Sequence, residues 1–155
     1  MPLALIHADI DHFKALNDRY GFVRGDEVIK FCGDVLLESA SMIDNCFVGH
    51  VGGDDFAVIL DAEDIERYAK SALDAYDEGI IEFYDFSEVL AGTIEVENRM
   101  GTLEKFPISS LSMGIVTNQH RELHSPAQAS SIAAEMKHFA KRQPGSNYQI
   151  DRRID

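Results

Sequence analysis

The pattern of apolar and polar residues along the chain predicts strands and helices in the order βααββαβαβ. Residues 3–10 form a short apolar run that ends in acidic residues, as is typical of a central strand. Residues 12–19 predict a short helix that stops at Tyr20 and Gly21. A second, longer helix is expected to begin at Asp26. Its apolar residues recur at helical spacing and are Val28, Phe31, Cys32, Val35, Leu36 and Ala40.

The middle of the chain predicts a β-hairpin followed by a long helix. Residues 46–60 contain two β-rich runs on either side of a Gly-Gly-Asp-Asp turn, which is a strong hairpin signal. Asp61 is expected to cap the helix that follows. The apolar face of that helix consists of Ile65, Tyr68, Ala69, Ala72, Leu73 and Tyr76.

The last part of the chain contains one irregular stretch between regular elements. Residues 85–106 lack a clear pattern and are longer than most loops, so we expect an insertion there. This stretch is either a functional insertion or contains a short strand pair around residues 92–96. Residues 106–117 predict a strand, and the Ser-Pro-Ala-Gln sequence at 125–128 predicts the start of a helix. Residues 147–150 predict a last strand.

These elements predict an α+β fold in which helices pack on a mainly antiparallel sheet. The 155 residues fit a single domain that spans residues 1–155. No apolar run approaches the roughly 20 residues of a membrane helix. Residues 1–8 also lack the features of a signal peptide. We therefore expect a cytoplasmic domain with no direct membrane insertion.

The chain is strongly acidic, and the acidic residues are concentrated in one stretch. The formal net charge is −13, which argues against nucleic acid or an anionic membrane as a partner. Residues 61–104 contain 13 acidic and three basic side chains, so this stretch carries most of the net charge. Two interpretations stay open for it: a solvated outer face, or a contact surface for a basic partner.

Two pairs of carboxylates mark the candidate chemistry. Asp9 and Asp11 end the first strand, and Asp54 and Asp55 lie in the hairpin turn. If the two strands are neighbours, these carboxylates meet at one edge of the sheet. They would repel one another unless a cation lies between them, and hard oxygen ligands suit Mg²⁺. Asp54 and Asp55 could equally be simple turn formers, since Gly and Asp dominate turns.

Longer motifs add a family resemblance. The segments HADIDHFKALNDRYGFVRGD at residues 7–26 and GHVGGDDFAV at residues 49–58 resemble the GGDEF family of diguanylate cyclase domains. The LSMGI segment at residues 111–115 and the AK followed by GSN at residues 140–147 are similar to later motifs of that family. The resemblance implies a ferredoxin-like βααββαβ core, as in nucleotidyl cyclases. It also implies cyclic di-GMP signalling, in which two GTP molecules on a homodimer are joined.

The resemblance also implies roles for particular residues. The signature turn is formed by Gly52, Gly53, Asp54, Asp55 and Phe56, of which Asp54 and Asp55 are the catalytic pair. Metal ions, Mg²⁺ or Mn²⁺, would be held by Asp9, the backbone of Ile10 and Asp54. The nucleotide, GTP or cyclic di-GMP, would contact Phe13, Lys14, Asn17, Asp26 and Lys141. Among these, Asn17 and Asp26 would bind guanine, and Lys14 and Lys141 would bind phosphates.

Several positions depart from the family pattern. Asp55 stands where the family has Glu, and its carboxylate therefore reaches roughly 1 Å less far, a displacement that can cost about a hundredfold in rate. His50 and Ser146 stand where arginines are usual, and Phe22 stands where a histidine is common. The inhibitory R-x-x-D motif is absent from residues 43–46.

Three functions stay open from the sequence. The segments YGFVRGD at residues 20–26 and FVGHVGGDDF at residues 47–56, with an acidic insertion before FPISSLSMG at residues 106–114, are similar to the GGDEF domain of proteins that also carry EAL and CBS domains. This narrower resemblance implies a domain excised from a larger signalling protein. The favoured hypothesis is then a degenerate domain that binds GTP with Mg²⁺ and regulates a linked EAL phosphodiesterase. The alternatives are an active diguanylate cyclase and a structural or dimerisation domain.

Overall fold

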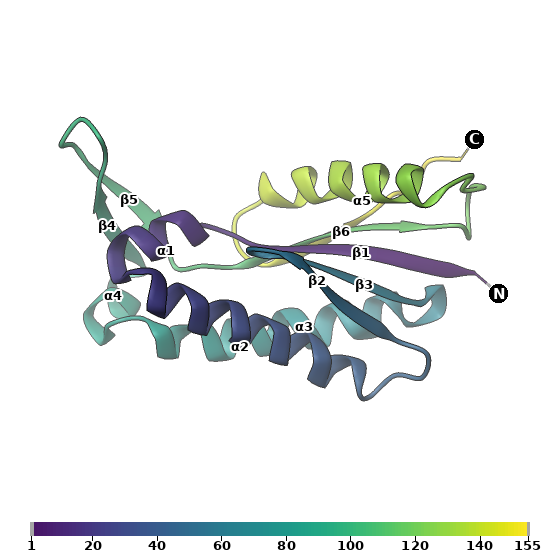
Figure 1. The fold of residues 1–155 in the computed structure, drawn as a ribbon, viewed down its shortest axis with the longest axis horizontal. Coiled ribbons are helices and arrows are strands. Elements are labelled where there is room, and N and C mark those ends of the chain that lie inside the picture. Colours follow the sequence, from purple (N-terminus) through teal and green to yellow (C-terminus); the bar gives the residue numbers. More distant parts are fainter. Residues whose placement is uncertain (1, 155) are drawn as a thin grey trace.

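A five-stranded sheet forms the centre of the computed structural model, which describes residues 2–154 (Figure 1). The strands are β1 (Leu3–Ile10), β2 (Phe47–Gly52), β3 (Asp55–Asp61), β6 (Leu111–Thr117) and β7 (Asn147–Ile150). Their order is β2-β3-β1-β6-β7, and only β6 and β7 run parallel. The mainly antiparallel sheet of the predicted α+β fold is therefore confirmed.

Helices cover both faces of this sheet. Helices α2 (Phe22–Ala40) and α3 (Ile65–Ile80) lie on one face, and α5 (Pro126–Lys141) lies on the other (Figure 1). Short 3-10 turns at Ala62–Asp64 and Ile81–Phe83 flank α3. No helix among residues 2–154 is both long enough and apolar enough to cross a membrane.

Successive side chains of β1 point alternately into the hydrophobic core and toward the face of the sheet that α5 covers. Ala4, Ile6, Ala8 and Ile10 are buried with α2 and α3 in the main core. The intervening side chains of β1 point toward α5, where Leu5 packs in a second apolar cluster. Asp9 is on this α5 side, so the first strand itself directs its carboxylate away from the core.

The expected insertion folds as an ordered unit. It contains α4 (Phe86–Ala91) and the hairpin of β4 (Thr93–Glu97) and β5 (Leu103–Pro107), so the alternative with a strand pair is confirmed. The unit lies beside α1 (Phe13–Tyr20) at one end of the molecule (Figure 1). Arg19 of α1 donates to Glu88 at 2.9 Å and to Asp85 at 3.2 Å, which ties α4 to α1.

Two element boundaries differ from the prediction. The second helix begins at Phe22 rather than at the predicted Asp26. The prediction missed the first turn because that turn is exposed and has no apolar stripe: Phe22 and Val23 are 78% and 77% exposed. The strand expected over residues 106–117 divides into β5 and β6. Between them, the amide of Ser109 donates to the Tyr84 hydroxyl instead of joining a strand ladder.

The two predicted helix caps have different outcomes. Ser125 caps α5 as expected, because its hydroxyl accepts a hydrogen bond from the Gln128 amide at 3.0 Å. Asp61 does not cap α3: it ends β3, and its side chain makes no capping hydrogen bond. The chain first passes through a 3-10 turn, and α3 begins at Ile65.

Gly114 of β6 allows α5 to approach the sheet closely. A Cβ atom at this position would lie 2.1 Å from both the Ala133 carbonyl oxygen and the Lys137 amide nitrogen. These contacts are with backbone atoms of α5, which cannot move aside as a flexible side chain would. The missing side chain of Gly114 therefore sets the distance between α5 and the strands that end at the candidate site.

We expect the Gly114→Ala variant to lower the free energy of unfolding by about 1–3 kcal/mol, because the added methyl forces α5 away from the sheet. Urea denaturation measures this change. Gly33→Ala in α2 is the matched control, since its Cβ would meet Phe56 at an ordinary 3.5 Å. Helix propensity predicts that this control gains about 0.5–1 kcal/mol. Equal stability of the two variants would contradict the packing argument.

Candidate metal and nucleotide site

Three carboxylates converge where β1 meets the β2–β3 turn. Asp9 is opposite Asp55 in the antiparallel register of β1 and β3, and Asp54 lies in the adjoining turn. One oxygen from each of Asp9, Asp54 and Asp55 lies within 4.8 Å of the others. The amide of Ile10 donates to the Asp54 carbonyl oxygen at 3.3 Å, which fixes the turn against the end of β1. We call Asp9, Asp54 and Asp55 the carboxylate cluster.

The signature turn is held by glycine conformations and by His50. Gly52 and Gly53 have φ values of 153° and 53°, and a residue with a side chain rarely adopts the second of these. The Nε2 atom of His50 lies 2.8 Å from the Gly53 carbonyl oxygen. Its ring stacks on Phe56 at a centroid distance of 4.6 Å. His50 thus supports the turn at the position where the family usually has arginine.

Asp11 does not join the cluster, contrary to the expectation that both aspartates of the first strand would meet the turn. Its carboxylate is buried and accepts hydrogen bonds from Ser110 at 2.6 Å and from Ser112 at 2.8 Å. Asp11 follows the last residue of β1, and its amide bonds to the Ser110 carbonyl group. This contact turns Asp11 toward the start of β6 and away from Asp54.

Two lysines of α5 reach the carboxylates from above the sheet. Lys141 Nζ is 3.0 Å from Asp9 and 2.8 Å from Asp11. Lys137 Nζ is 3.6 Å from Asp9 and 3.4 Å from Asp55. Lys141 was predicted from the sequence as a phosphate contact, whereas Lys137 was not predicted. The four-residue spacing between them could have indicated Lys137, because it places both ammonium groups on one face of a helix.

Burial and charge shift the protonation of this site. Burial raises the pKa of Asp9 from 3.8 to about 6, because it penalises the charged carboxylate, although Lys141 and Lys137 oppose this rise. Burial alone would lower the pKa of the Lys141 ammonium. Its contacts with Asp11 and Asp9 outweigh burial and raise that pKa above its usual value.

The cluster fits a small divalent cation. Asp9 Oδ1 is buried and has no hydrogen-bond partner among residues 2–154, so one oxygen of this carboxylate is left unsatisfied. The donors are hard carboxylate oxygens, which are the ligands that Mg²⁺ and Mn²⁺ accept. A cation here would reduce the repulsion between the carboxylates and would give the unsatisfied Asp9 oxygen a partner.

Three of the predicted nucleotide contacts, Phe13, Lys14 and Asn17, lie on α1. His12 adopts a left-handed conformation, with φ 59° and ψ 28°, before α1 begins. Asn17 Oδ1 is buried without a hydrogen-bond partner among the described residues. A Cβ on Gly25 would lie 1.7 Å from that oxygen and 3.3 Å from Phe13, so the glycine provides the space for both side chains. This end of α1 therefore holds one polar group in need of a partner.

Two of the predicted nucleotide contacts are on the surface. Asp26 is exposed on α2, one residue after Gly25. Lys14 is exposed and forms an ion pair with Asp18 at 3.0 Å. Neither side chain reaches the carboxylate cluster in this structure, and their roles stay predictions.

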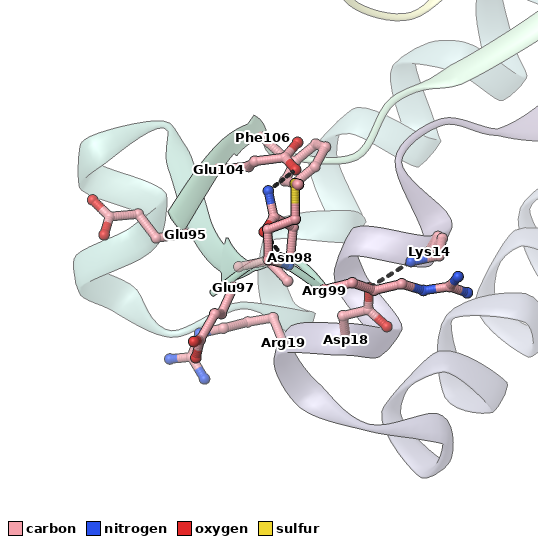
Figure 2. A pocket seen from close by; sticks show the side chains of 11 residues that line it. Lys14, Asp18, Arg19, Glu95, Glu97, Asn98, Arg99, Glu104 and Phe106 are labelled. Atoms are coloured by element: carbon pink, nitrogen blue, oxygen red, sulfur yellow. Dashed lines mark hydrogen bonds and ion pairs between the residues drawn. The ribbon is translucent and has the colours of Figure 1, made fainter. Parts of the chain in front are cut away.

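A separate pocket of about 890 Å³ lies between α1 and the β4–β5 hairpin. Figure 2 shows the ion pair of Lys14 with Asp18 on α1, and Arg99 extending from the hairpin toward these residues. The lining mixes both charges with Met100 and Phe106. Asp9, Asp54 and Asp55 do not belong to this lining, so the carboxylate cluster lies outside this pocket.

The motifs and this geometry agree with one family. Residues 1–147 match the model of the family described as "Diguanylate cyclase, GGDEF domain". The chain therefore belongs to the GGDEF domain family of diguanylate cyclases, which act in cyclic di-GMP signalling. A diguanylate cyclase of Vibrio cholerae is 40% identical over 65 residues, which are 42% of this chain and 20% of that protein. The matched segments span between 9% and 20% of the length of five such curated relatives.

Solved structures show the same fold. The active GGEEF domain of a diguanylate cyclase from Vibrio cholerae is 25% identical, with a TM-score of 0.73, and the match covers 99% of this chain and 85% of that one. The GGDEF domain of DgcB from Caulobacter crescentus, solved in complex with c-di-GMP, is 24% identical with a TM-score of 0.60. That match covers 96% of this chain and 77% of the other.

We expect the affinity for Mn²⁺ to fall as the pH falls through about 6, because a proton on Asp9 then competes with the metal. Isothermal titration calorimetry at pH 5 and pH 7.5 measures the change. Asp9→Asn should bind weakly at both pH values. Asp64→Asn changes a second acidic group, formed by Asp61, Glu63 and Asp64, and should behave like the unmodified chain. A pH-independent affinity would contradict the role of Asp9.

Proposed function

We propose that this domain binds GTP together with Mg²⁺ or Mn²⁺ and acts mainly as a nucleotide-responsive regulatory module with little cyclase turnover. The observation that carries this proposal is the convergence of Asp9, Asp54 and Asp55 within 4.8 Å, next to the start of α1. Asp9, Asp54 and the backbone of Ile10 would hold the cation. When bound, the cation would neutralise phosphate charge and polarise a phosphoryl oxygen.

The protein's own groups would position the nucleotide. The unpartnered Asn17 oxygen offers an acceptor for the N–H groups of guanine, and Asp26 would add a second acceptor from α2. Phe13 would pack against the bound nucleotide. Lys141 and Lys14 would contact phosphates, and Lys141 is already held beside the cluster by Asp11 at 2.8 Å.

Two features support weak turnover. The Asp55 carboxylate is shorter than the glutamate of the family and is paired with Lys137 at 3.4 Å. Ser146, at the position of a phosphate-binding arginine, serves a structural purpose instead. Its hydroxyl donates to Asp77 at 2.5 Å and accepts from the Leu111 amide at 2.9 Å. The domain thus lacks the phosphate contact of the arginine replaced by Ser146. It also lacks part of the reach of the family's glutamate, which is replaced by Asp55.

An active diguanylate cyclase is the second candidate. The similarity to the active GGEEF domain of Vibrio cholerae favours it, as does the presence of an acid at every position of the cluster. In this reaction the 3′-oxygen of each GTP forms a bond to the α-phosphorus of the other, and pyrophosphate leaves. Two domains must then face one another as a homodimer. A structural or dimerisation domain is the third candidate and would bind no nucleotide.

We expect no cyclic di-GMP from the unmodified domain incubated with GTP and Mn²⁺, and measurable product from Asp55→Glu. The longer side chain restores a reach of roughly 1 Å, which is a displacement large enough to change a rate about a hundredfold. Chromatography of the reaction mixture measures the product. Asp54→Ala combined with Asp55→Glu is the control and should be inactive. Product from the unmodified domain at a similar rate would establish the active cyclase instead.

We expect Asn17→Ala to weaken GTP binding about tenfold, which corresponds to one or two lost hydrogen bonds, and to leave ATP binding nearly unchanged. Fluorescence titration with labelled nucleotides measures both affinities. Asn118→Ala is the matched control, because Asn118 accepts from the Leu3 amide at the far end of β1. Equal weakening for both nucleotides would remove Asn17 from guanine recognition.

The regulated neighbour is proposed to be an EAL phosphodiesterase domain in a protein that also carries CBS domains. This step depends on the narrower sequence resemblance alone. In the longer protein, GTP should change the rate of cyclic di-GMP hydrolysis, and Asp54→Ala should remove that effect. An identical hydrolysis rate with and without GTP would favour the structural candidate.

A further inference from the structure

The ammonium group of Lys137 lies beside two carboxylates of the carboxylate cluster. Its Nζ atom lies 3.6 Å from Asp9 and 3.4 Å from Asp55, and its side chain is only 15% exposed. The same two carboxylates belong to the set that fits a divalent cation. A single group of acids therefore faces two alternative sources of positive charge.

The backbone holds Lys137 in this position. Gly114 lets α5 pack so closely that a Cβ there would lie 2.7 Å from the Lys137 Cα atom. The start of the Lys137 side chain is thus fixed over the sheet, directly beside the strand that pairs with β1. Only the flexible end of the side chain is free to change its position.

The two lysines of α5 differ in what holds them. Lys141 is bound to Asp11 as well as Asp9, and Asp11 is itself fixed by Ser110 and Ser112. Lys137 has Asp9 and Asp55 as its ion-pair partners among residues 2–154. If a metal takes these two carboxylates, Lys141 keeps a partner and Lys137 does not.

There is room for Lys137 to move. A pocket of about 220 Å³ adjoins its side chain and is lined by His7, Ala8, Val51, Asp55, Phe56, Ala134 and Lys137. The pocket lies between α5 and the strands β1, β2 and β3, so it offers the Lys137 ammonium space beside the carboxylates.

We propose that Lys137 competes with the divalent cation for Asp9 and Asp55, so that the metal binds only when the Lys137 ammonium moves out of the cluster. The proposal deepens the proposed function and rests on its metal site. A unit positive charge 3.6 Å from Asp9 and 3.4 Å from Asp55 opposes a second cation in the same cluster through repulsion and through loss of its own ion pairs. Lys137 therefore lowers the affinity of the empty domain for metal.

The test measures Mn²⁺ binding without nucleotide by the electron paramagnetic resonance of free Mn²⁺. We expect Lys137→Met to tighten the binding about tenfold or more, because the competing charge is gone and the apolar stem remains. Lys137→Arg keeps the charge and should bind Mn²⁺ no more tightly than the unmodified chain. Lys70→Met in α3 is the matched control for a lost surface lysine and should change nothing.

Two further measurements separate this proposal from the proposed function. Urea denaturation checks that Lys137→Met is folded, and Lys137→Gln provides a second neutral variant. Asp54→Ala tests the metal site itself. If Asp54→Ala abolishes Mn²⁺ binding but neither neutral variant tightens it, competition by Lys137 is overturned and the metal site stands. If Asp54→Ala also leaves binding unchanged, both proposals fail.

Discussion

Repulsion between Asp9, Asp54 and Asp55 is the constraint on which the site depends. The register of β1 with β3 puts Asp9 opposite Asp55, and the hairpin turn adds Asp54, so backbone hydrogen bonds force the three acids together. Such an arrangement persists only if cations compensate for it. Here α5 supplies two ammonium groups that lower the pKa of Asp9, while burial and, to a smaller extent, the neighbouring Asp54 raise it.

The compensation requires a helix packed unusually close to the sheet. Gly114 has no side chain under α5, and the alternation of β1 sends Asp9 to that same face. The opposite face of the strand holds Ala8 and Ile10 in the main core. One face of β1 therefore packs in the core, and the other carries Asp9 to the candidate site. A register shift of one residue would turn the core side chains to the α5 side and Asp9 into the core.

Local patterns made much of this structure predictable. The apolar run of β1, the Gly-Gly-Asp-Asp hairpin and the Ser125 cap each have a short-range physical cause, and each lies where it was expected. The predicted start of α2 was wrong, because the exposed first turn of this helix has no periodic pattern of apolar residues. Asp11 and Lys137 depend on tertiary contacts. The spacing of Lys137 from Lys141 places both on one helix face, but it does not identify the carboxylate 82 residues away that Lys137 contacts.

The lysines also separate folding from metal binding in this domain. A cluster of acids with no internal cation would depend on metal for its charge balance, as in small metal-dependent folds. In this chain Lys141 bridges Asp9 and Asp11, so a positive charge remains at the site in the absence of metal. The large core around β1, α2 and α3 lies on the other face and needs no ligand. Metal occupancy of the cluster can then vary with conditions while the fold persists, as the proposed regulatory role requires.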